Sequence, residues 1–204
     1  MNARITVLLV EDHPVVLRGL RAICAEQEDL EVVGEVATSA DALGAALNLE
    51  PDAVMLPIKL GGTRSGIELC RAIKSVSSAR VVVFTSFTRT VDVQLAMLAG
   101  ADALISKAAA VEDFVAALRQ VASGRHGLVL GPGARTPTTA QRFSQTEPLT
   151  DREDEILQLV LDGLTNPEIS SRLKIEVSTV KTHMRNILRK LSVGTRRGLF
   201  VEPD

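Results

Sequence analysis

The sequence predicts an α/β fold, a doubly wound parallel sheet of (βα)5 type, joined to an all-α domain. Over about the first 120 residues, short apolar runs rich in Val, Ile and Leu alternate with segments of helical spacing, as expected for strands buried on both faces between layers of helices. A stretch rich in Gly, Pro, Ser and Thr then interrupts the alternation, and only helical patterns follow it. We therefore expect domains at residues 1–124 and 148–204, joined by a linker at residues 125–147.

The expected strands and helices follow from the spacing of the apolar residues. Continuous apolar runs indicate strands at residues 5–10, 30–36, 53–56, 80–84 and 103–105. Apolar residues three and four positions apart indicate helices at residues 15–25, 40–49, 66–76, 90–99 and 111–121. In such a sheet the carboxyl ends of the strands meet at one edge, which is where these folds bind their ligands.

Composition and charge exclude several classes of protein. The chain of 204 residues has a formal net charge of -2, five Phe and no Trp or Tyr. Single-strand nucleic-acid binders need aromatic stacking surface and polycationic binders need net positive charge, so any nucleic-acid contact must come from a local patch. No apolar stretch approaches the roughly 20 residues of a membrane helix, and we expect no signal peptide. We expect a cytoplasmic protein that does not contact a membrane.

The two cysteines, Cys24 and Cys70, each fall in a helical apolar pattern. They are too few and too far apart in sequence to indicate a disulfide framework or a metal cluster. We interpret them as reduced core thiols, with a redox role as the alternative, and we expect neither a bound metal nor a cofactor.

The C-terminal domain carries clear signals for helix ends. Thr150 with Glu153, and Thr165 with Glu168, have the S/T-x-x-E spacing by which side chains bind the free N–H groups at a helix start. Gly163 is well placed to end the first of these helices. Further helices are expected at residues 177–191 and, shorter, from about residue 195.

The helix expected at residues 177–191 has two contrasting faces. One face is apolar and consists of Val180, Met184, Ile187 and Leu191; the opposite face is polar and basic and consists of Ser178, Lys181, Thr182, Arg185 and Arg189. Residues 165–197 contain eight Lys or Arg and only two acids, so positive charge is concentrated around this helix. The pattern fits a helix-turn-helix unit that enters a major groove, and the alternative is a solvated helix face.

Residues 149–193 closely resemble the C-terminal DNA-binding domain of LuxR/NarL-type transcription regulators, through the segments LTDRE, GLTNPEI, TVKTH and NILRKL. The resemblance implies a four-helix domain that binds double-stranded DNA with its third helix. It places Lys181, Thr182 and Arg185 at base edges, and it gives phosphate or positioning contacts to Thr179, Asn166, Arg189 and Lys190. This family usually has Ser at the cap of the third helix, where this chain has Glu176, so the first turn should be less well capped.

Residues 5–123 resemble the receiver domains of response regulators, through the segments VLLVEDHPVVLRGL, VVVFTS and LAGADALISKAA. A working receiver holds Mg²⁺ with two acids, accepts a phosphoryl group on a third carboxylate, binds that group with a Thr and neutralises it with a Lys. The resemblance assigns the two acids to Glu11 and Asp12, the Thr to Thr85 and the Lys to Lys107.

Pro57 occupies the phospho-acceptor position in this comparison. Proline has no nucleophilic atom, and Asp52 lies at the other end of the same expected strand. We therefore expect no aspartyl phosphorylation and at most weak binding of Mg²⁺. The simplest interpretation of the degenerate pocket is a salt bridge between Lys107 and the acidic pair, with Thr85 nearby. The alternative is a pocket that binds a metabolite or a partner side chain.

These observations lead to a principal function and an alternative. The principal hypothesis is a sequence-specific transcription regulator that forms a homodimer, through receiver helices at residues 15–25 and 111–121, and is controlled by dimerisation, a ligand or a partner. The alternative is an interaction protein whose degenerate receiver titrates another regulator or docks on a sensor. An enzyme is not expected, because no nucleophile and base can be paired.

Overall fold

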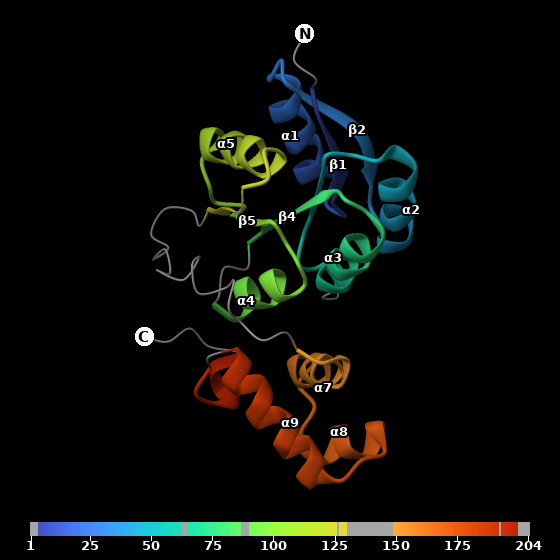
Figure 1. The fold of residues 1–204 in the computed structure, drawn as a ribbon, viewed down its shortest axis with the longest axis vertical. Helices are drawn as coiled ribbons and strands as arrows, with labels where there is room; N and C mark the ends of the chain where they lie inside the picture. Colours follow the sequence, from blue (N-terminus) through green and yellow to red (C-terminus); the bar gives the residue numbers. More distant parts are fainter. Residues whose placement is uncertain are drawn as a thin grey trace. The chain divides into compact units, whose positions relative to one another are not determined.

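The computed structural model describes residues 4–62, 65–86, 90–125, 127–129, 149–191 and 193–199. The chain divides into two compact units. The N-terminal unit contains the sheet, and the C-terminal unit contains the last helices (Figure 1). Among the described residues, no helix is long and apolar enough to cross a membrane. The expected domain boundaries stay a prediction, since residues 130–148 lie outside the described part of the chain.

Strands and helices alternate along the N-terminal unit, as the sequence predicts. The elements are β1 (Ile5–Val10), α1 (Pro14–Ala25), β2 (Leu30–Val36), α2 (Ser39–Leu49), β3 (Ala53–Leu56), α3 (Ser65–Val76), β4 (Arg80–Thr85), α4 (Thr90–Leu98), β5 (Ala103–Ser106), α5 (Val111–Ala122) and β6 (Gly127–Val129). Neighbouring strands pair in parallel in the order β2-β1-β3-β4-β5-β6. The order changes direction between β1 and β3, which is the doubly wound arrangement. The expected fold class is confirmed.

The sixth strand differs from the prediction, which places residues 127–129 in a linker. β6 pairs with β5, with Ala103 opposite Gly127 and Ile105 opposite Val129. Without β6, β5 would be an edge strand with unpaired backbone groups. The short segment after α5 satisfies them by adding one more parallel strand.

Helices cover both faces of the sheet. In Figure 1, α1 and α5 lie on one side of the strands, and α2 and α3 lie on the other. The side chains between α1, α5 and the sheet form one buried cluster, which includes Val7, Leu9, Leu20, Cys24, Met55, Val82, Phe114 and Leu118. Strand residues alternate between the two faces, so Leu8 and Val83, both fully buried, point to the other layer. Polar side chains are therefore left to the two edges where the strands begin and end.

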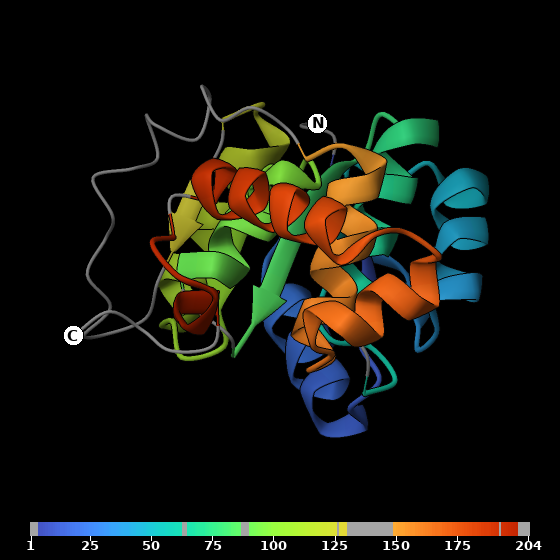
Figure 2. The ribbon, with the colours of Figure 1, turned by 90° about the horizontal axis from the view of Figure 1, so that it is seen from below.

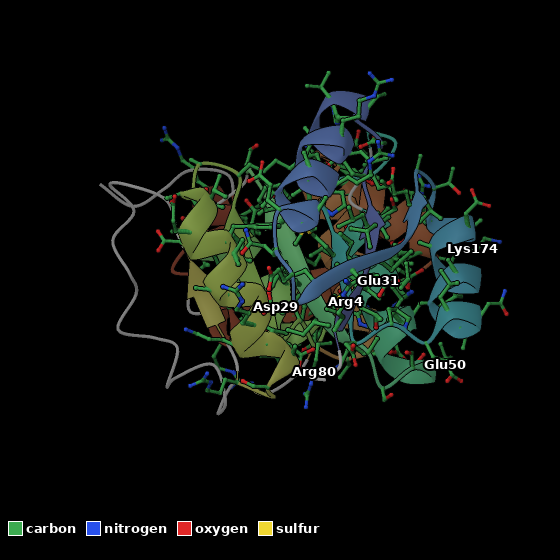
Figure 3. All side chains as sticks on the ribbon, turned by 90° about the horizontal axis from the view of Figure 1, so that it is seen from above. Arg4, Asp29, Glu31, Glu50, Arg80 and Lys174 are labelled. Atoms are coloured by element: carbon green, nitrogen blue, oxygen red, sulfur yellow. The ribbon has the colours of Figure 1, made fainter. Side chains whose placement is uncertain are left out.

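The amino ends of the strands carry structural polar contacts. Figure 3 labels Arg4 and Glu31, whose charged groups lie 3.9 Å apart. Asp52 directly precedes β3 and accepts hydrogen bonds from the backbone N–H and the hydroxyl of Thr6, both at 2.8 Å. Asp52 thus lies at the opposite end of β3 from Pro57, as predicted.

A buried aspartate, Asp102, joins α3, β4 and β5 at the same amino edge. Its carboxylate oxygens lie 2.9 Å from Lys74 Nζ and 2.9 Å from Arg80 Nη1, and one of them accepts the backbone N–H of Val81 at 2.8 Å. Burial raises the pKa of Asp102, but these hydrogen bonds and charges outweigh it and hold the pKa below its usual value. The group is fully engaged within the fold.

The turn after β3 is packed tightly against the start of α3. Pro57 follows β3 directly and is buried, as are Ile58 and Leu60. Gly66 donates its N–H to the carbonyl of Ile58 at 3.2 Å. A Cβ atom at Gly66 would lie only 1.8 Å from the carbonyl oxygen of Pro57, so this position requires glycine.

Both cysteines lie in the core, as the sequence predicts. Cys24 and Cys70 are buried and form no disulfide. Burial raises the pKa of Cys24 to about 11 and that of Cys70 to about 12. The reactive thiolate forms are therefore scarce at neutral pH, and the interpretation as core thiols is confirmed.

The C-terminal unit consists of α7 (Asp151–Leu161), α8 (Asn166–Leu173), α9 (Val177–Lys190) and the 3-10 helix η1 (Arg196–Leu199). Figure 2 shows the orange helices α7 and α8 beside the red α9, which contacts both. The expected capping pair is present at α7, where Glu153 N–H donates to Thr150 Oγ1 at 3.3 Å and Thr150 N–H donates to a Glu153 carboxylate oxygen at 2.9 Å. The predicted stop is also confirmed, because Gly163 has φ of +91° directly after the last turn.

A buried ion pair joins the first turn of α7 to the end of α9. Lys190 Nζ lies 2.7 Å from Glu153 Oε2, and each side chain is 4% exposed. Burial raises the pKa of Glu153, but the hydrogen bonds from Lys190 and Thr150 outweigh it, so the pKa lies below its usual value. Glu153 therefore serves both the cap of α7 and the packing of α9.

We expect Gly66→Ala to destabilise the N-terminal unit, by about 1–3 kcal/mol, because the added methyl group would collide with the backbone of Pro57. Gly44→Ala is the matched control, since a methyl group there meets nothing within 4 Å and should raise the stability of α2 by about 0.5–1 kcal/mol. Urea unfolding followed by circular dichroism measures both changes. Equal stability of the two variants would contradict the close packing.

We expect Lys190→Met to destabilise the C-terminal unit by about 3 kcal/mol, because it leaves the Glu153 carboxylate buried without its cation. The control is Lys181→Met on the exposed side of the same helix, which should change stability by less than about 0.5 kcal/mol. Hydrogen exchange of the full-length chain, resolved to peptides of α7 and α9, distinguishes the two. Unchanged exchange in Lys190→Met would show that the pair contributes nothing.

Candidate functional site

The two faces of α9 are separated as the sequence predicts. Val180, Ile187 and Leu191 are fully buried and Met184 is 6% exposed, so the apolar stripe faces α7 and α8. Lys181, Thr182, Arg185, Thr179 and Arg189 are all exposed. The polar face is therefore available to a binding partner while the apolar face holds the helix in place.

Two cations on the exposed face are not engaged by any residue that the structure describes. Neither Lys181 nor Arg185 makes an ion pair or hydrogen bond with any other described residue. Thr182 differs, because its hydroxyl donates to the carbonyl oxygen of Ser178 at 3.1 Å. Lys and Arg in this state can donate to acceptors on another molecule without first breaking an internal bond. An α-helix about 10–12 Å across also matches the width of the DNA major groove.

The start of α9 is set by a tight turn after α8. Lys174 adopts a left-handed conformation with φ of +51°, and Ile175 N–H donates to the carbonyl of Ser170 at 3.1 Å. Glu176 precedes the helix but makes no side-chain cap, in agreement with the expectation of a less well capped first turn. The left-handed lysine was not predicted, because only Gly and Asn signal that conformation in a sequence.

Asn166, which the resemblance places at a phosphate or positioning contact, is held by η1. Arg196 donates from Nη1 to Asn166 Oδ1 at 2.7 Å and from Nη2 to the carbonyl of Leu164. An arginine can only donate, so the bonded atom of Asn166 must be its oxygen. The amide N–H₂ of Asn166 is thus left to donate elsewhere. Sequence reasoning missed Arg196, because nothing in its spacing links it to the start of α8.

Lys190 is placed differently from the expectation that it contacts DNA phosphate. Its side chain is buried and bound to Glu153, because residue 190 follows Ile187 by three positions and falls toward the buried side of the helix. A phosphate contact would require this ion pair to break. The exposed positively charged face of α9 therefore consists of Lys181, Arg185 and Arg189.

The second candidate site lies at the carboxyl ends of β1, β4 and β5. Glu11 follows β1 and is 2% exposed. Lys107 follows β5, and its Nζ lies 2.6 Å from Glu11 Oε2 and 5.6 Å from the centre of the Phe84 ring. Thr85 is the last residue of β4, and its backbone carbonyl oxygen accepts a hydrogen bond from the backbone N–H of Lys107 at 2.8 Å. The parallel sheet thus brings together Glu11, Thr85 and Lys107, as predicted.

Asp12 belongs to the same pocket but does not pair with Lys107 as the simplest interpretation predicts. One carboxylate oxygen of Asp12 accepts the backbone N–H of Gly61 at 2.8 Å. Burial raises the pKa of Asp12, but this hydrogen bond and the neighbouring His13 outweigh it, so the pKa lies below its usual value. Asp12 therefore binds the loop that follows Pro57, and among the described residues the salt bridge of Lys107 is with Glu11.

His13, which directly follows Asp12, is a further member of the pocket. Its Nδ1 atom lies 2.8 Å from Glu11 and 3.0 Å from Asp12. The hydrogen bond to Glu11 and the charges of both acids raise the pKa of His13. Glu11, Asp12 and His13 are the described residues whose ligand atoms, within 4.8 Å of one another, could hold a metal ion. Their adjacency at a strand end is the signal that identifies the group.

Comparison with known proteins identifies the families that the two units match. Residues 7–119 match the family described as the response regulator receiver domain, and residues 147–202 match the bacterial regulatory proteins of the luxR family. The response regulator protein VraR of Staphylococcus epidermidis is 37% identical over 196 residues, which cover 94% of this chain and 92% of VraR. The nitrate/nitrite response regulator protein NarL of Escherichia coli is 34% identical over 197 residues, covering 94% and 91%.

The fold also matches a solved structure over nearly its full length. RcsB from Salmonella enterica serovar Typhimurium, bound to the promoter P1flhDC in the presence of phosphomimetic BeF3-, superimposes with a TM-score of 0.63 at 23% identity and covers 96% of each chain. At this identity the likeness shows the fold alone. Because the receiver match spans more than half of the chain and the relatives exceed 30% identity over nearly all of it, the chain belongs to the response regulators that join a receiver domain to a luxR-family regulatory domain.

Proposed function

We propose that this protein is a transcription regulator that binds specific sequences of double-stranded DNA with the exposed face of α9. The observation that carries the proposal is the pair of exposed cations, Lys181 and Arg185, which no other described residue engages. Arg and Lys side chains donate to guanine O6 and N7 in the major groove. Thr179 and Arg189, which are exposed, and the amide N–H₂ group of Asn166 supply contacts to phosphate in this proposal.

The protein binds DNA as a homodimer in this proposal. One helix reads only a few base pairs, so two copies related by a two-fold axis are needed for a site of useful length. The first turns of α1 and α5 support a dimer surface, since Val15 is 84% exposed and Val111 is 44% exposed while both helices cover the same face of the sheet. A sensor or another regulator is the alternative partner for this surface.

The receiver unit does not undergo aspartyl phosphorylation in this proposal. Pro57 directly follows β3, where a receiver presents its acceptor carboxylate, and it offers no nucleophilic atom. Lys107 forms an ion pair with Glu11, and Asp12 accepts a hydrogen bond from the backbone N–H of Gly61. Mg²⁺ requires near-octahedral oxygen ligands, and with Pro57 in place of a carboxylate this pocket does not fit the ion. Control then comes from dimerisation, a ligand or a partner protein.

The test is selection of genomic promoter fragments by the untreated full-length protein, followed by titration of the selected site against salt. Selective binding should occur without a phosphodonor, and the logarithm of the affinity should fall linearly with the logarithm of the salt concentration, because phosphate contacts release counterions. Lys181→Ala and Arg185→Ala should each weaken selective binding by about 1–3 kcal/mol.

Arg71→Ala is the matched control, since it removes one exposed positive charge from α3 and should leave the affinity unchanged. If the Lys181 and Arg185 variants bind as selectively as the wild type, α9 is not the reading helix. DNA affinity indifferent to both residues, together with preferred pairing to another regulator, would favour the interaction protein.

Incubation with acetyl phosphate and Mg²⁺ should add no phosphoryl group to this chain, because Pro57 cannot accept one. Mass spectrometry of the intact protein measures the outcome, with a receiver protein that carries an acceptor aspartate as the positive control. A stoichiometric gain of one phosphoryl group mapped to the N-terminal unit would refute the proposal that the receiver unit is not phosphorylated.

A further inference from the structure

Two adjacent arginines of η1 are used in different ways. Arg196 is partly buried and donates two hydrogen bonds, from Nη1 to Asn166 Oδ1 at 2.7 Å and from Nη2 to the carbonyl oxygen of Leu164. Arg197 is exposed, and no described residue binds its side chain. Arg196 thus joins η1 to the start of α8, 30 positions earlier in the sequence.

The hydrogen bond from Arg196 fixes which end of the Asn166 amide is offered to a partner. A guanidinium can only donate, so it holds the amide by its oxygen and leaves the N–H₂ group to face away. No described residue accepts a hydrogen bond from this nitrogen, and Asn166 is partly exposed. Without Arg196 the amide could rotate about its last side-chain bond and present its oxygen instead.

The charge of Arg196 favours an anion as that partner. Both acceptors of Arg196 are neutral, and no described carboxylate forms an ion pair with it. The positive charge lies against the amide oxygen of Asn166, so it polarises the amide and strengthens donation from the N–H₂ group. Asn166 is also the first residue of α8, where a helix carries partial positive charge. In a helix-turn-helix, the helix that precedes the reading helix crosses the phosphate backbone.

We propose that Arg196 is a positioning residue, which holds Asn166 so that its amide N–H₂ donates to one phosphate of the DNA backbone. This inference rests on the proposed DNA-binding function and adds the residue that orients the contact. Arg196 stays bound to Asn166 in the complex and does not touch the DNA. Because a phosphate contact carries no base sequence, it sets the position of α9 in the groove and leaves the choice of bases to α9.

The experiment replaces single phosphates of the selected site by uncharged methylphosphonate, one position at a time. Affinities for this series are measured at one salt concentration with the full-length wild type and with Asn166→Ala, Arg196→Met and Arg197→Met. The two arginine variants remove the same charge from adjacent positions, so Arg197→Met is the matched control. Asn166→Asp is a further variant, which keeps an acceptor for Arg196 but has no N–H donors.

The wild type should bind about tenfold more weakly when one particular phosphate is replaced, the effect of losing one hydrogen bond to a charged group. Asn166→Ala and Arg196→Met should lose this effect, and both should bind the unmodified site about as weakly as the wild type binds the replaced one. Arg197→Met should keep the effect in full. Asn166→Asp should bind DNA more weakly while its melting temperature is unchanged or higher, because a carboxylate pairs more strongly with Arg196.

Other results overturn the inference. If Arg196→Met weakens binding to every DNA alike and keeps the tenfold effect, Arg196 supports the fold only. If Arg196→Met and Asn166→Ala lose the effects of two different phosphates, Arg196 contacts DNA itself. Undiminished DNA binding by Asn166→Asp refutes the inference even where Arg196→Met does not fold.

The failure of this inference is distinguishable from the failure of the proposed function. If Asn166→Ala responds to every phosphate as the wild type does, while Lys181→Ala still loses selective binding, the proposed function stands and the positioning role of Arg196 is refuted. If the wild type selects no sequence at all, the proposed function and this inference fail together.

Discussion

The parallel direction of the strands is the constraint on which the N-terminal unit depends. Because all neighbouring strands run the same way, their carboxyl ends lie at one edge, and residues nearly a hundred positions apart meet there. Glu11 after β1 and Lys107 after β5 thus form an ion pair at 2.6 Å. Because helices cover both faces of the sheet, polar side chains gather at the ends of the strands. The amino edge uses its polar groups differently, since Asp52 and Asp102 bind neighbouring strands and helices there.

Several polar groups of this pocket have partners among the described residues. Lys107 is bound by Glu11, Asp12 by the Gly61 N–H, and His13 lies between the two acids. Pro57 and the buried residues after it fill the end of β3. A receiver that is phosphorylated needs an acceptor carboxylate, and Pro57 supplies none. The ion pair between Glu11 and Lys107 favours a single resting arrangement of the pocket, in agreement with the proposed independence from phosphorylation.

The C-terminal unit is organised by the burial of one side of α9. The apolar stripe fixes the rotation of the helix about its axis, and that rotation determines which polar residues face outward. The Glu153–Lys190 pair adds a polar anchor between α7 and α9. The same helix therefore has a satisfied buried side and an exposed side on which Lys181 and Arg185 are uncompensated. A local concentration of positive charge attracts anionic partners, which supports the proposed contact of this face with DNA.

Sequence alone determined the fold class, the order of strands and helices, the capping pair at Thr150 and the two faces of α9, because these depend on local spacing and on short-range hydrogen bonds. It also identified Glu11, Thr85 and Lys107 as neighbours, since parallel topology fixes where strand ends meet. Tertiary structure decided the rest. The β6 strand formed because β5 offered an unpaired edge. Lys190 is buried and forms an ion pair with Glu153. Asp12 accepts a hydrogen bond from Gly61, and Asn166 accepts one from Arg196. Each of these partners is distant in sequence, and a long side chain selects among such partners only when packing has brought them within reach.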